Sequence, residues 1–264
     1  MRGTRSLPLT VLLSVSAVCL SYTRAEPAAR ARLYVMSYNI HVGVGMDKKQ
    51  DLKRIAEVIK RSRADIVGLQ EVDRGVERTG RVDEIKELAK LTGMDYAFAH
   101  NLDYQGGQYG VAVLSRFPIL AIDHWRYANR RERERRGFIR VEVEVEGRRI
   151  NFVTTHLDYQ FEDGRVFETE QLLKALADVR GPLLVVGDFN EEPRGGAYEM
   201  MLKAGFADAW TQEAATGLTY PADKPTKRID YIFHRGLGAD VRAAAKVPDT
   251  LASDHRPLIV SFSF

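Results

Sequence analysis

Polar residues interrupt or end apolar runs in five regions of the sequence. In order, these regions are SYNIH at 37–41, LQEVD at 69–73, TTHLD at 154–158, GDFN at 187–190, and the C-terminal pair RIDYIF at 228–233 and SDHRP at 253–257. The candidate site residues within them are Asn39, Glu71, His156, Asp188, Asn190, Asp230, Asp254 and His255. Oxygen ligands without cysteine favour a hard cation such as Mg²⁺, and paired aspartate and histidine are typical of an activated water. The predicted chemistry is metal-assisted cleavage of a phosphate ester.

Buried strands are expected to position the first acidic candidates. Glu71 follows IVGLQ, which predicts a strand that ends by presenting the carboxylate to a metal, although a lone glutamate at a strand end is often only an edge residue. Asp188 and Asn190 are two positions apart after LLVVG, and strand geometry would turn both toward one side. There the carboxylate would orient a water and the amide would donate to a phosphate oxygen. Taken alone, GDFN is also typical of a turn.

The C-terminal pair of motifs predicts an oriented imidazole. A histidine serves as a base, or as a partner of the phosphate, when a carboxylate fixes its ring. Neighbouring residues on a strand point to opposite sides, so we expect Asp254 to face the metal and Asp230 to orient His255. His156 is a second imidazole candidate, although a lone histidine there is more often structural. Asn39 would either donate a hydrogen bond within the site or cap a strand end.

A run of arginines and glutamates, RYANRRERERRGF, occupies residues 126–138. Such a charge run is usually a solvated loop or an exposed helical turn. The functional alternative is that Arg136, or the nearby Arg140, reaches the substrate phosphate.

The first 25 residues are typical of a secretory signal peptide. Arg2 and Arg5 precede an apolar stretch over 7–20, and small residues precede a cleavage site after Ala25. An uncleaved anchor is the alternative, and the Cys19 context matches a lipoprotein poorly because Val18 stands where a small residue is usual. We therefore expect an exported protein, periplasmic or secreted, with a mature chain of 26–264.

Removal of residues 1–25 changes the charge balance. The segment contains three arginines and no acidic residue, so the formal net charge falls from +3 to 0. A neutral mature chain lacks the overall positive field of a dedicated nucleic-acid binder. Since Cys19 is the only cysteine, the mature chain would have no disulfide.

The apolar periodicity predicts one α/β (α+β) domain over 26–264. Helices are expected at 51–61, 82–91, 166–179 and 197–203, and strands at 33–38, 65–70, 95–100, 110–115, 119–125, 138–146, 183–187, 229–233, 240–246 and 258–263. In the segment VEVEVEGRRINFVTTHL, apolar and charged residues alternate, a turn with a glycine follows, and a second apolar run comes next. This pattern predicts a hairpin. Hairpins mixed with helices favour two packed sheets flanked by helices over a doubly wound parallel sheet.

The motifs, in this order, resemble those of the endonuclease/exonuclease/phosphatase superfamily, which includes DNase I, abasic-site endonucleases, neutral sphingomyelinases and inositol polyphosphate 5-phosphatases. The resemblance covers nearly all of 33–264 and implies a DNase I-like, four-layered αββα sandwich with its site at one edge of the two sheets. It implies the following roles: Glu71 as principal metal ligand, Asn39 and Asp254 near the metal, His255 with Asp230 as base or phosphate-facing imidazole, Asp188 and Asn190 on the nucleophile or phosphate, and His156 on the scissile phosphate or leaving group.

Two further positions qualify the resemblance. Tyr109, in QYGVAVLSRFP, is similar in placement to the active-site tyrosine of abasic-site endonucleases, with a different spacing to Gly110. His41 stands where nuclease members often have an acidic residue, which argues against two tightly held metals and against DNA repair.

The motif sequences look most like those of exported bacterial hydrolases grouped with proteins of GPI-anchor lipid remodelling. We expect Mg²⁺ as cofactor, with Mn²⁺ as a substitute, and a monomer without a required protein partner. The expected substrate is a phospholipid or other small phosphodiester, with extracellular nucleic acid as the second choice. The alternative of another class is a non-catalytic module that binds phosphate or a partner on the same scaffold.

Overall fold

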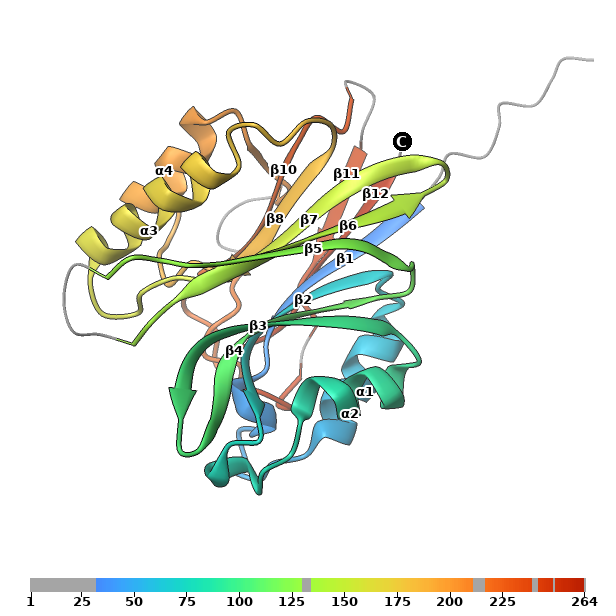
Figure 1. Ribbon diagram of the computed structural model, residues 1–264, viewed down its shortest axis with the longest axis vertical. Helices are drawn as coiled ribbons and strands as arrows, with labels where there is room; N and C mark the ends of the chain where they lie inside the picture. Colours follow the sequence, from blue (N-terminus) through green and yellow to red (C-terminus); the bar gives the residue numbers. More distant parts are fainter. Residues whose placement is uncertain (1–31, 130–133, 211–216, 239–241, 249, 264) are drawn as a thin grey trace, which may run out of the picture.

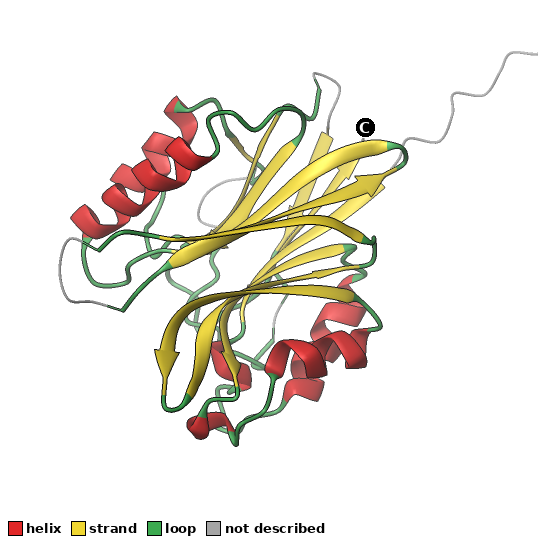
Figure 2. Cartoon of the chain, in the orientation of Figure 1, coloured by secondary structure: helices red, strands yellow, loops and turns green. Residues whose placement is uncertain are grey.

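The computed structural model describes residues 32–129, 134–210, 217–238, 242–248 and 250–263. The expected signal peptide and part of the arginine run lie outside these residues. Within them the chain forms two six-stranded sheets packed face to face, with helices on both outer faces (Figures 1 and 2). The predicted four-layered αββα sandwich is therefore confirmed.

The first sheet has the strand order β11-β12-β1-β2-β4-β3. Its strands are β1 (Arg32–Asn39), β2 (Ile66–Arg74), β3 (Asp95–Tyr104), β4 (Gly107–Ser115), β11 (Arg242–Lys246) and β12 (Leu258–Ser263). Helices α1 (Leu52–Ser62) and α2 (Glu84–Thr92) cover its outer face, and short 3₁₀ turns η1 (His41–Gly43) and η2 (Glu77–Thr79) follow β1 and β2. Asp51 caps α1 by accepting from the backbone N–H groups of Lys53 and Arg54.

The second sheet has the order β5-β6-β7-β8-β10-β9. Its strands are β5 (Ile119–Arg126), β6 (Gly137–Val145), β7 (Arg148–His156), β8 (Leu183–Asp188), β9 (Ala207–Asp208) and β10 (Asp230–Arg235), and its outer face carries α3 (Glu162–Ala175) and α4 (Gly196–Lys203). The predicted β6–β7 hairpin is present. Among the described strands, only the β1–β2 and β7–β8 pairs are parallel, which excludes a doubly wound parallel sheet.

The main error in the predicted elements concerns the helix expected at 166–179. Helix α3 begins at Glu162 and ends at Ala175. Its first turn, EDGR from Glu162, contains no apolar side chain. Hydrophobic periodicity therefore does not reveal where the helix begins. Acidic side chains at a helix N-terminus are favoured by the helix dipole, which explains the early start.

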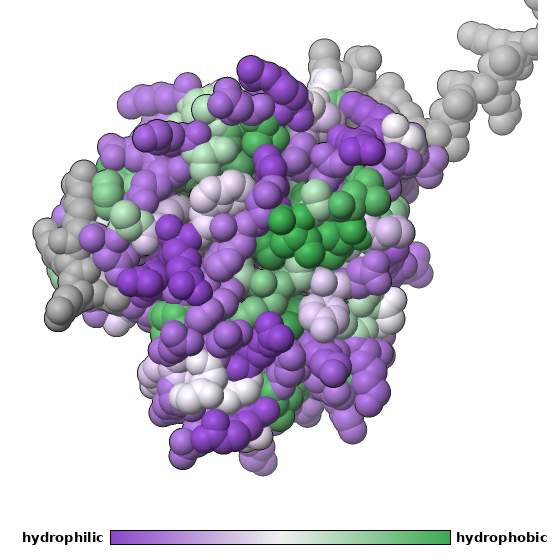
Figure 3. Space-filling view, viewed as in Figure 1, coloured by the Kyte–Doolittle hydropathy of each residue, from purple (hydrophilic) through white to green (hydrophobic). Residues whose placement is uncertain are grey.

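The surface is mixed in character and includes an apolar area on the edge strand β5. Leu120 and Ile122 of this strand are exposed, and Figure 3 shows a hydrophobic area on this face over β5. Among the described residues, no helix is both long and apolar enough to cross a membrane.

A glycine of the first sheet packs directly against side chains of the second. A methyl group on Gly68 of β2 would lie 2.3 Å from a methyl carbon of Val186 on β8 and 2.7 Å from Oγ1 of Thr154 on β7. Real side-chain contacts are never that short. Gly68 therefore sets the spacing between the two sheets beside the strand ends that carry the polar motifs.

We expect Gly68→Ala to destabilise the protein by about 1–3 kcal/mol, because the added methyl group overpacks the space between the sheets. Urea denaturation measures the change in the free energy of unfolding. In a Val186→Ala background the penalty should be smaller, since one of the clashing methyl groups is gone. An equal penalty in both backgrounds would refute the steric explanation.

Candidate functional site

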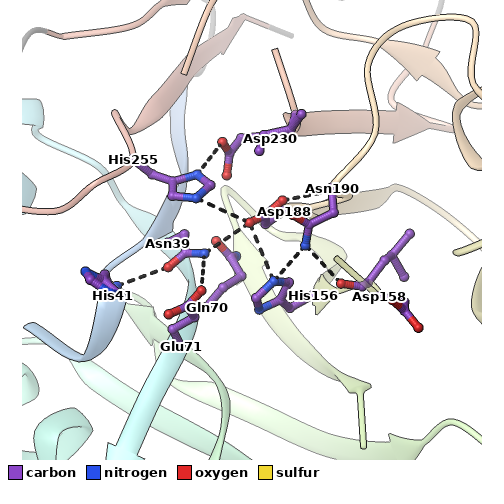
Figure 4. A network of polar contacts seen from close by, with 12 residues as sticks. Asn39, His41, Gln70, Glu71, His156, Asp158, Asp188, Asn190, Asp230 and His255 are labelled. Atoms are coloured by element: carbon purple, nitrogen blue, oxygen red, sulfur yellow. Dashed lines mark hydrogen bonds and ion pairs between the residues drawn. The ribbon is translucent and has the colours of Figure 1, made fainter. Parts of the chain in front are cut away.

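A cavity of about 1820 Å³ opens at the edge of the two sheets where the polar motifs meet. The predicted residues on its wall are Glu71, Tyr109, Arg136, His156, Asp188, Asn190, Asp254 and His255. Asn39 and Asp230 are buried directly behind this wall and are hydrogen-bonded to residues on it (Figure 4). The fold therefore gathers ten of the eleven predicted site residues at this cavity, and only Arg140 lies elsewhere.

Strand pairing explains why residues far apart in the chain meet. His156 is the register partner of Asp188 in the parallel β7–β8 pair, and Asp188 is the partner of Asp230 in the antiparallel β8–β10 pair. All three lie at the same edge of the second sheet. Asn39, at the end of β1, brings the first sheet to the same place.

Glu71 is delivered by a β-bulge and not by a strand end. Strand β2 continues to Arg74, and its register with β4 shifts between Leu69 and Val72. Glu71 itself has φ of 56°, a left-handed conformation that is uncommon for a residue with a side chain. Bulges re-aim side chains and are frequent beside active sites. The predicted position in the site is present, but the predicted strand end is wrong.

The side-chain amide of Asn39 joins carboxylates from both sheets. Its Oδ1 accepts a hydrogen bond of 3.0 Å from the backbone N–H of His41, which fixes the orientation of the amide. Its Nδ2 then donates to Glu71 Oε1 at 2.9 Å and to Asp188 Oδ2 at 3.0 Å. Asn39 thus presents N–H groups to both carboxylates and holds them close together.

Asn190 reaches the site through a turn. Its φ of 51° is incompatible with the expected strand, and its backbone N–H donates to Asp188 Oδ1 at 2.8 Å. The side-chain nitrogen donates to the Leu157 carbonyl at 3.0 Å and lies 2.9 Å from His156 Nε2. The GDFN motif therefore forms the turn that its sequence suggested, and it also places Asp188 and Asn190 on the cavity wall.

The expected pairing of Asp230 with His255 is present. His255 Nδ1 lies 2.9 Å from Asp230 Oδ2, and its Nε2 points toward Asp188 Oδ2 at 3.6 Å. Asp254 and His255 lie in a loop before β12 and not on a strand, so the argument from opposite strand faces was wrong. Both side chains nevertheless line the cavity.

Opposing electrostatic effects set the charges of His255 and Asp188. Burial lowers the pKa of His255, but the neighbouring carboxylates of Asp230 and Asp188 outweigh it and raise that pKa to about 10. Burial, together with the nearby Asp230 charge, raises the pKa of Asp188 to about 7. These surroundings therefore favour a protonated His255 imidazole against the Asp230 carboxylate and make Asp188 easier to protonate than an ordinary aspartate.

His156 differs from His255 because its partner is a cation. Arg136 Nη1, which can only donate, lies 2.8 Å from His156 Nδ1. Burial, then Arg136 and His255, lower the pKa of His156 well below its usual value. Its other ring nitrogen, Nε2, lies 2.9 Å from the amide nitrogen of Asn190 and 3.5 Å from Asp188 Oδ2, so N–H donors face both ring nitrogens.

Of the two arginine candidates, only Arg136 lies at the cavity. Arg136 is 3% exposed and lines the cavity, where it also pairs with Glu134 at 3.0 Å. Arg140 lies further along β6, binds Asp123 of β5 and stacks over Trp125. It does not line the cavity, so the structure contradicts the suggestion that Arg140 reaches the phosphate.

Several residues on the cavity wall were not predicted. The Tyr220 ring lies 4.8 Å from the His255 ring, and Arg78 lies over the rings of Tyr104 and Tyr109. Arg78 falls within the family-like stretch after Glu71, which was a usable signal. The segment around Tyr220 carries no pattern that would have pointed to the site. His41, the departure from the nuclease pattern, has its Nδ1 3.7 Å from Asp254 Oδ1.

The donor set fits a hard divalent cation. Ligand atoms of Asp188, Asp230 and His255 lie within 4.8 Å of one another, but hydrogen bonds among themselves and with Asn39 already engage these groups. Glu71 and Asp254 are less buried and present carboxylates to the same cavity. Carboxylate oxygens without thiolates suit Mg²⁺ or Mn²⁺. Glu71 and Asp254 are therefore the better candidates for ligands.

Comparison with known proteins places this site in a family. Residues 36–255 match the profile described as the Endonuclease/Exonuclease/phosphatase family. The uncharacterized protein YbhP of Escherichia coli K12 is 28% identical over 242 residues, covering 85% of this chain and 93% of YbhP.

Solved structures share the fold at lower identity. A family protein from Bacteroides thetaiotaomicron superposes with a TM-score of 0.73 at 20% identity, covering 89% of this chain and 98% of that one. The human Nocturnin catalytic domain gives a TM-score of 0.69 at 24% identity, with 89% and 94% coverage. The mannosyl-6-phosphatase Bt3783 of B. thetaiotaomicron gives 0.69 at 19%, with 88% and 100% coverage.

We expect Asp230→Asn to lower the pKa of His255 in the metal-free protein, because the variant removes the closest carboxylate that favours the protonated ring. NMR titration of the His255 imidazole in the presence of EDTA measures the shift. Asp103→Asn, which alters an exposed partner of His100, serves as control and should leave His255 unchanged. An unaltered His255 titration in Asp230→Asn would contradict this electrostatic account.

Proposed function

The chain belongs to the endonuclease/exonuclease/phosphatase family, and from this premise we propose that it is an exported, divalent-metal-dependent phosphodiesterase. Members of this family are hydrolases that act on phosphate esters. The single observation that carries the proposal is the Asn39 bridge, which places Glu71 and Asp188 together at the cavity beside two differently charged imidazoles.

The proposed reaction is in-line attack of water on the phosphorus atom. Glu71 and Asp254 would hold Mg²⁺, or Mn²⁺ in its place, and the bound cation would offset charge on a non-bridging oxygen and on the leaving group. The remaining steps belong to the protein's own side chains.

Asp188 is the residue best placed to orient the water and accept its proton. Its two oxygens are fixed by Asn39 and by the Asn190 backbone, and it stands between the two imidazoles. His255, held by Asp230, would donate to a phosphoryl oxygen, because an imidazole flanked by carboxylates favours its protonated form. Asp188 would therefore act as the base and His255 as the hydrogen-bond donor.

His156, Asn190 and Arg136 would bind the phosphoryl group. Arg136 Nη1 and Asn190 Nδ2 hold the two ring nitrogens of His156, so the three side chains meet on one wall of the cavity. Donors placed where charge develops are among the largest contributions to such catalysis, each worth about 10²–10³ in rate. Tyr109, buried on the same wall, would contact the ester group.

The preferred substrate is a phospholipid or other small phosphodiester. The neutral charge expected of the mature chain disfavours a dedicated nucleic-acid enzyme, which is kept as the second choice. The mannosyl-6-phosphatase, Nocturnin and the Caenorhabditis elegans protein TDP2 share the fold at 19–24% identity without indicating a substrate for this chain. A monomer suffices for the reaction, because the described chain supplies every group used.

We expect residues 26–264 to hydrolyse bis(p-nitrophenyl) phosphate with Mg²⁺ or Mn²⁺ and to lose this activity in EDTA. Glu71→Ala and Asp188→Asn should each abolish turnover, since one removes the expected metal ligand and the other the carboxylate that orients the water. Release of p-nitrophenolate measures the rate.

The control is Glu57→Ala, an exposed glutamate of α1 whose loss should not change the rate. Circular dichroism should show that all three variants are folded. Near-wild-type activity in Glu71→Ala or Asp188→Asn would remove that residue's role. Metal binding without any turnover would favour the non-catalytic binding module.

Export is proposed from residues 1–25 alone. In a Gram-negative host, the full chain should appear in the periplasm or medium with Glu26 as its first residue, because the segment has the charge and apolar pattern of a cleaved signal. Mass spectrometry of the fractionated protein measures this. Residues 26–264 expressed alone should stay in the cytoplasm, and a full chain that also stays there uncleaved would refute export.

A further inference from the structure

A buried carboxylate fixes an arginine of the cavity wall that no proposed catalytic step uses. Arg78, in the 3₁₀ turn η2, lines the cavity. Its Nε and Nη2 donate to Asp73 Oδ2 and Oδ1 at 2.8 and 2.9 Å, and Thr79 Oγ1 also donates to Asp73 Oδ2 at 3.2 Å. The Asp73 side chain is 0% exposed and that of Arg78 is 36% exposed. The ion pair is therefore buried at its negative end and open at its positive end.

Two tyrosine rings lie against the guanidinium of Arg78. Its Cζ atom is 4.7 Å from the ring centroid of Tyr104 and 5.3 Å from that of Tyr109. Contacts of this kind are attractive and orient the planar guanidinium. The backbone N–H of Arg78 also donates to Gln105 Oε1 at 3.0 Å, which ties turn η2 to the β3–β4 hairpin. The position of the Arg78 side chain is thus fixed before any ligand binds.

The contacts with Asp73 leave a second hydrogen-bonding edge of Arg78 unused. A guanidinium has five N–H donors in a planar fork, and Asp73 accepts from one on Nε and one on Nη2. The remaining donors, two on Nη1 and one on Nη2, have no acceptor among the described residues. Asp103, an acidic residue on the same wall, is paired with His100 at 3.0 Å instead. A paired edge of this fork matches two oxygens of a carboxylate or a phosphate.

Tyr109 lies between this arginine and the reaction centre. It is the register partner of Asp73 in the β2–β4 pair, and Asp73 follows Glu71 by two residues. Burial raises the pKa of the Tyr109 hydroxyl, the Glu71 carboxylate raises it further, and the Arg78 charge opposes both. The hydroxyl is therefore near enough to both charged groups to respond to them. A ligand with its phosphate at Glu71 has Arg78 on the far side of one tyrosine ring.

We propose that Arg78 forms a second anion subsite, which binds a carboxylate or phosphate group on the alcohol portion of the phosphate ester. The inference rests on the proposed function and narrows it. The substrate is then an acidic phospholipid or another small diester that carries a second anionic group beyond the scissile phosphate. The cavity of about 1820 Å³ has room for such a group beside the phosphate.

Esters that differ only in the charge of one group test the proposal. The esters are ω-carboxyalkyl p-nitrophenyl phosphates, their neutral primary amides and the ω-phosphonoalkyl analogues, each with chains of two to five carbons to span the distance from Glu71 to Arg78. All release p-nitrophenolate, so kcat/KM compares the alcohol portions. The wild type should prefer at least one anionic ester to the amide of the same length by about tenfold, as a charge-assisted hydrogen bond allows. The preferred group distinguishes a carboxylate-bearing substrate from a phosphate-bearing one.

Arg78→Gln should abolish this preference, because the variant removes the charge and the paired donors. The same change leaves the Asp73 carboxylate buried without its partner, which can prevent folding. The double variant Asp73→Asn/Arg78→Gln removes both charges and should show the same loss of preference. A purely structural role would lower kcat/KM for every ester equally and keep the wild-type ratio, and that result would overturn the proposal.

Arg140→Gln is the matched control. Arg140 also pairs with an aspartate, Asp123, and lies over an aromatic ring, Trp125, but it does not line the cavity. This variant should keep the preference for the anionic ester. Loss of the preference here as well would overturn the proposal, since it would indicate a general effect of protein charge. A wild type that prefers neither anionic ester at any chain length would also overturn it.

Failure of the proposed function is recognised separately, as absence of turnover on every ester. In that case, calorimetric binding of ω-phosphonoalkanoates of the same chain lengths, and of their primary amides, still tests the subsite. Tighter binding of an acid than of its amide that is lost in Arg78→Gln would support the inference. Equal binding of acid and amide by the wild type, or a difference that persists in Arg78→Gln, would overturn it.

Discussion

The hydrogen bonds from one buried amide to two carboxylates hold the candidate site together. Asn39 ends the central strand β1 and donates to Glu71 of its own sheet and to Asp188 of the other. Two carboxylates so close repel each other in a poorly polarisable interior, and shared N–H donors offset that repulsion. The backbone of His41 in turn fixes the amide, so the tight turn after β1 is part of the site.

Irregular strand pairing determines which side chains reach the site. In a regular strand, side chains alternate between the two faces, so consecutive residues cannot both reach one rim. The bulges at Glu71 in β2 and at Asn101 in β3 break this alternation on either side of Gly110, and the first of them directs Glu71 to the cavity. The glycines of this region allow the backbones to come close enough for the irregular pairing.

Different partners give the two imidazoles different charges. His156 is held by Arg136, and its pKa is lowered by burial and by that cation. His255 is held by Asp230, and its pKa is raised despite burial. Asp188 lies between the two rings. The surroundings therefore favour a neutral imidazole on one side of the carboxylate and a protonated imidazole on the other.

The sequence by itself determined most of the helices and strands, the sandwich and the polar motif residues that meet at the cavity, because apolar periodicity and polar residues at the ends of apolar runs are local properties of the chain. Only the tertiary structure decided the bulges at Glu71 and Asn101, since register exists only between paired strands. The tertiary structure also decided that Arg136 lines the cavity and that Arg140 does not. Four residues of strand span about 13 Å, which carries Arg140 away from the rim to Asp123. The charge of each imidazole was likewise set by partners distant in sequence, which no local pattern contains.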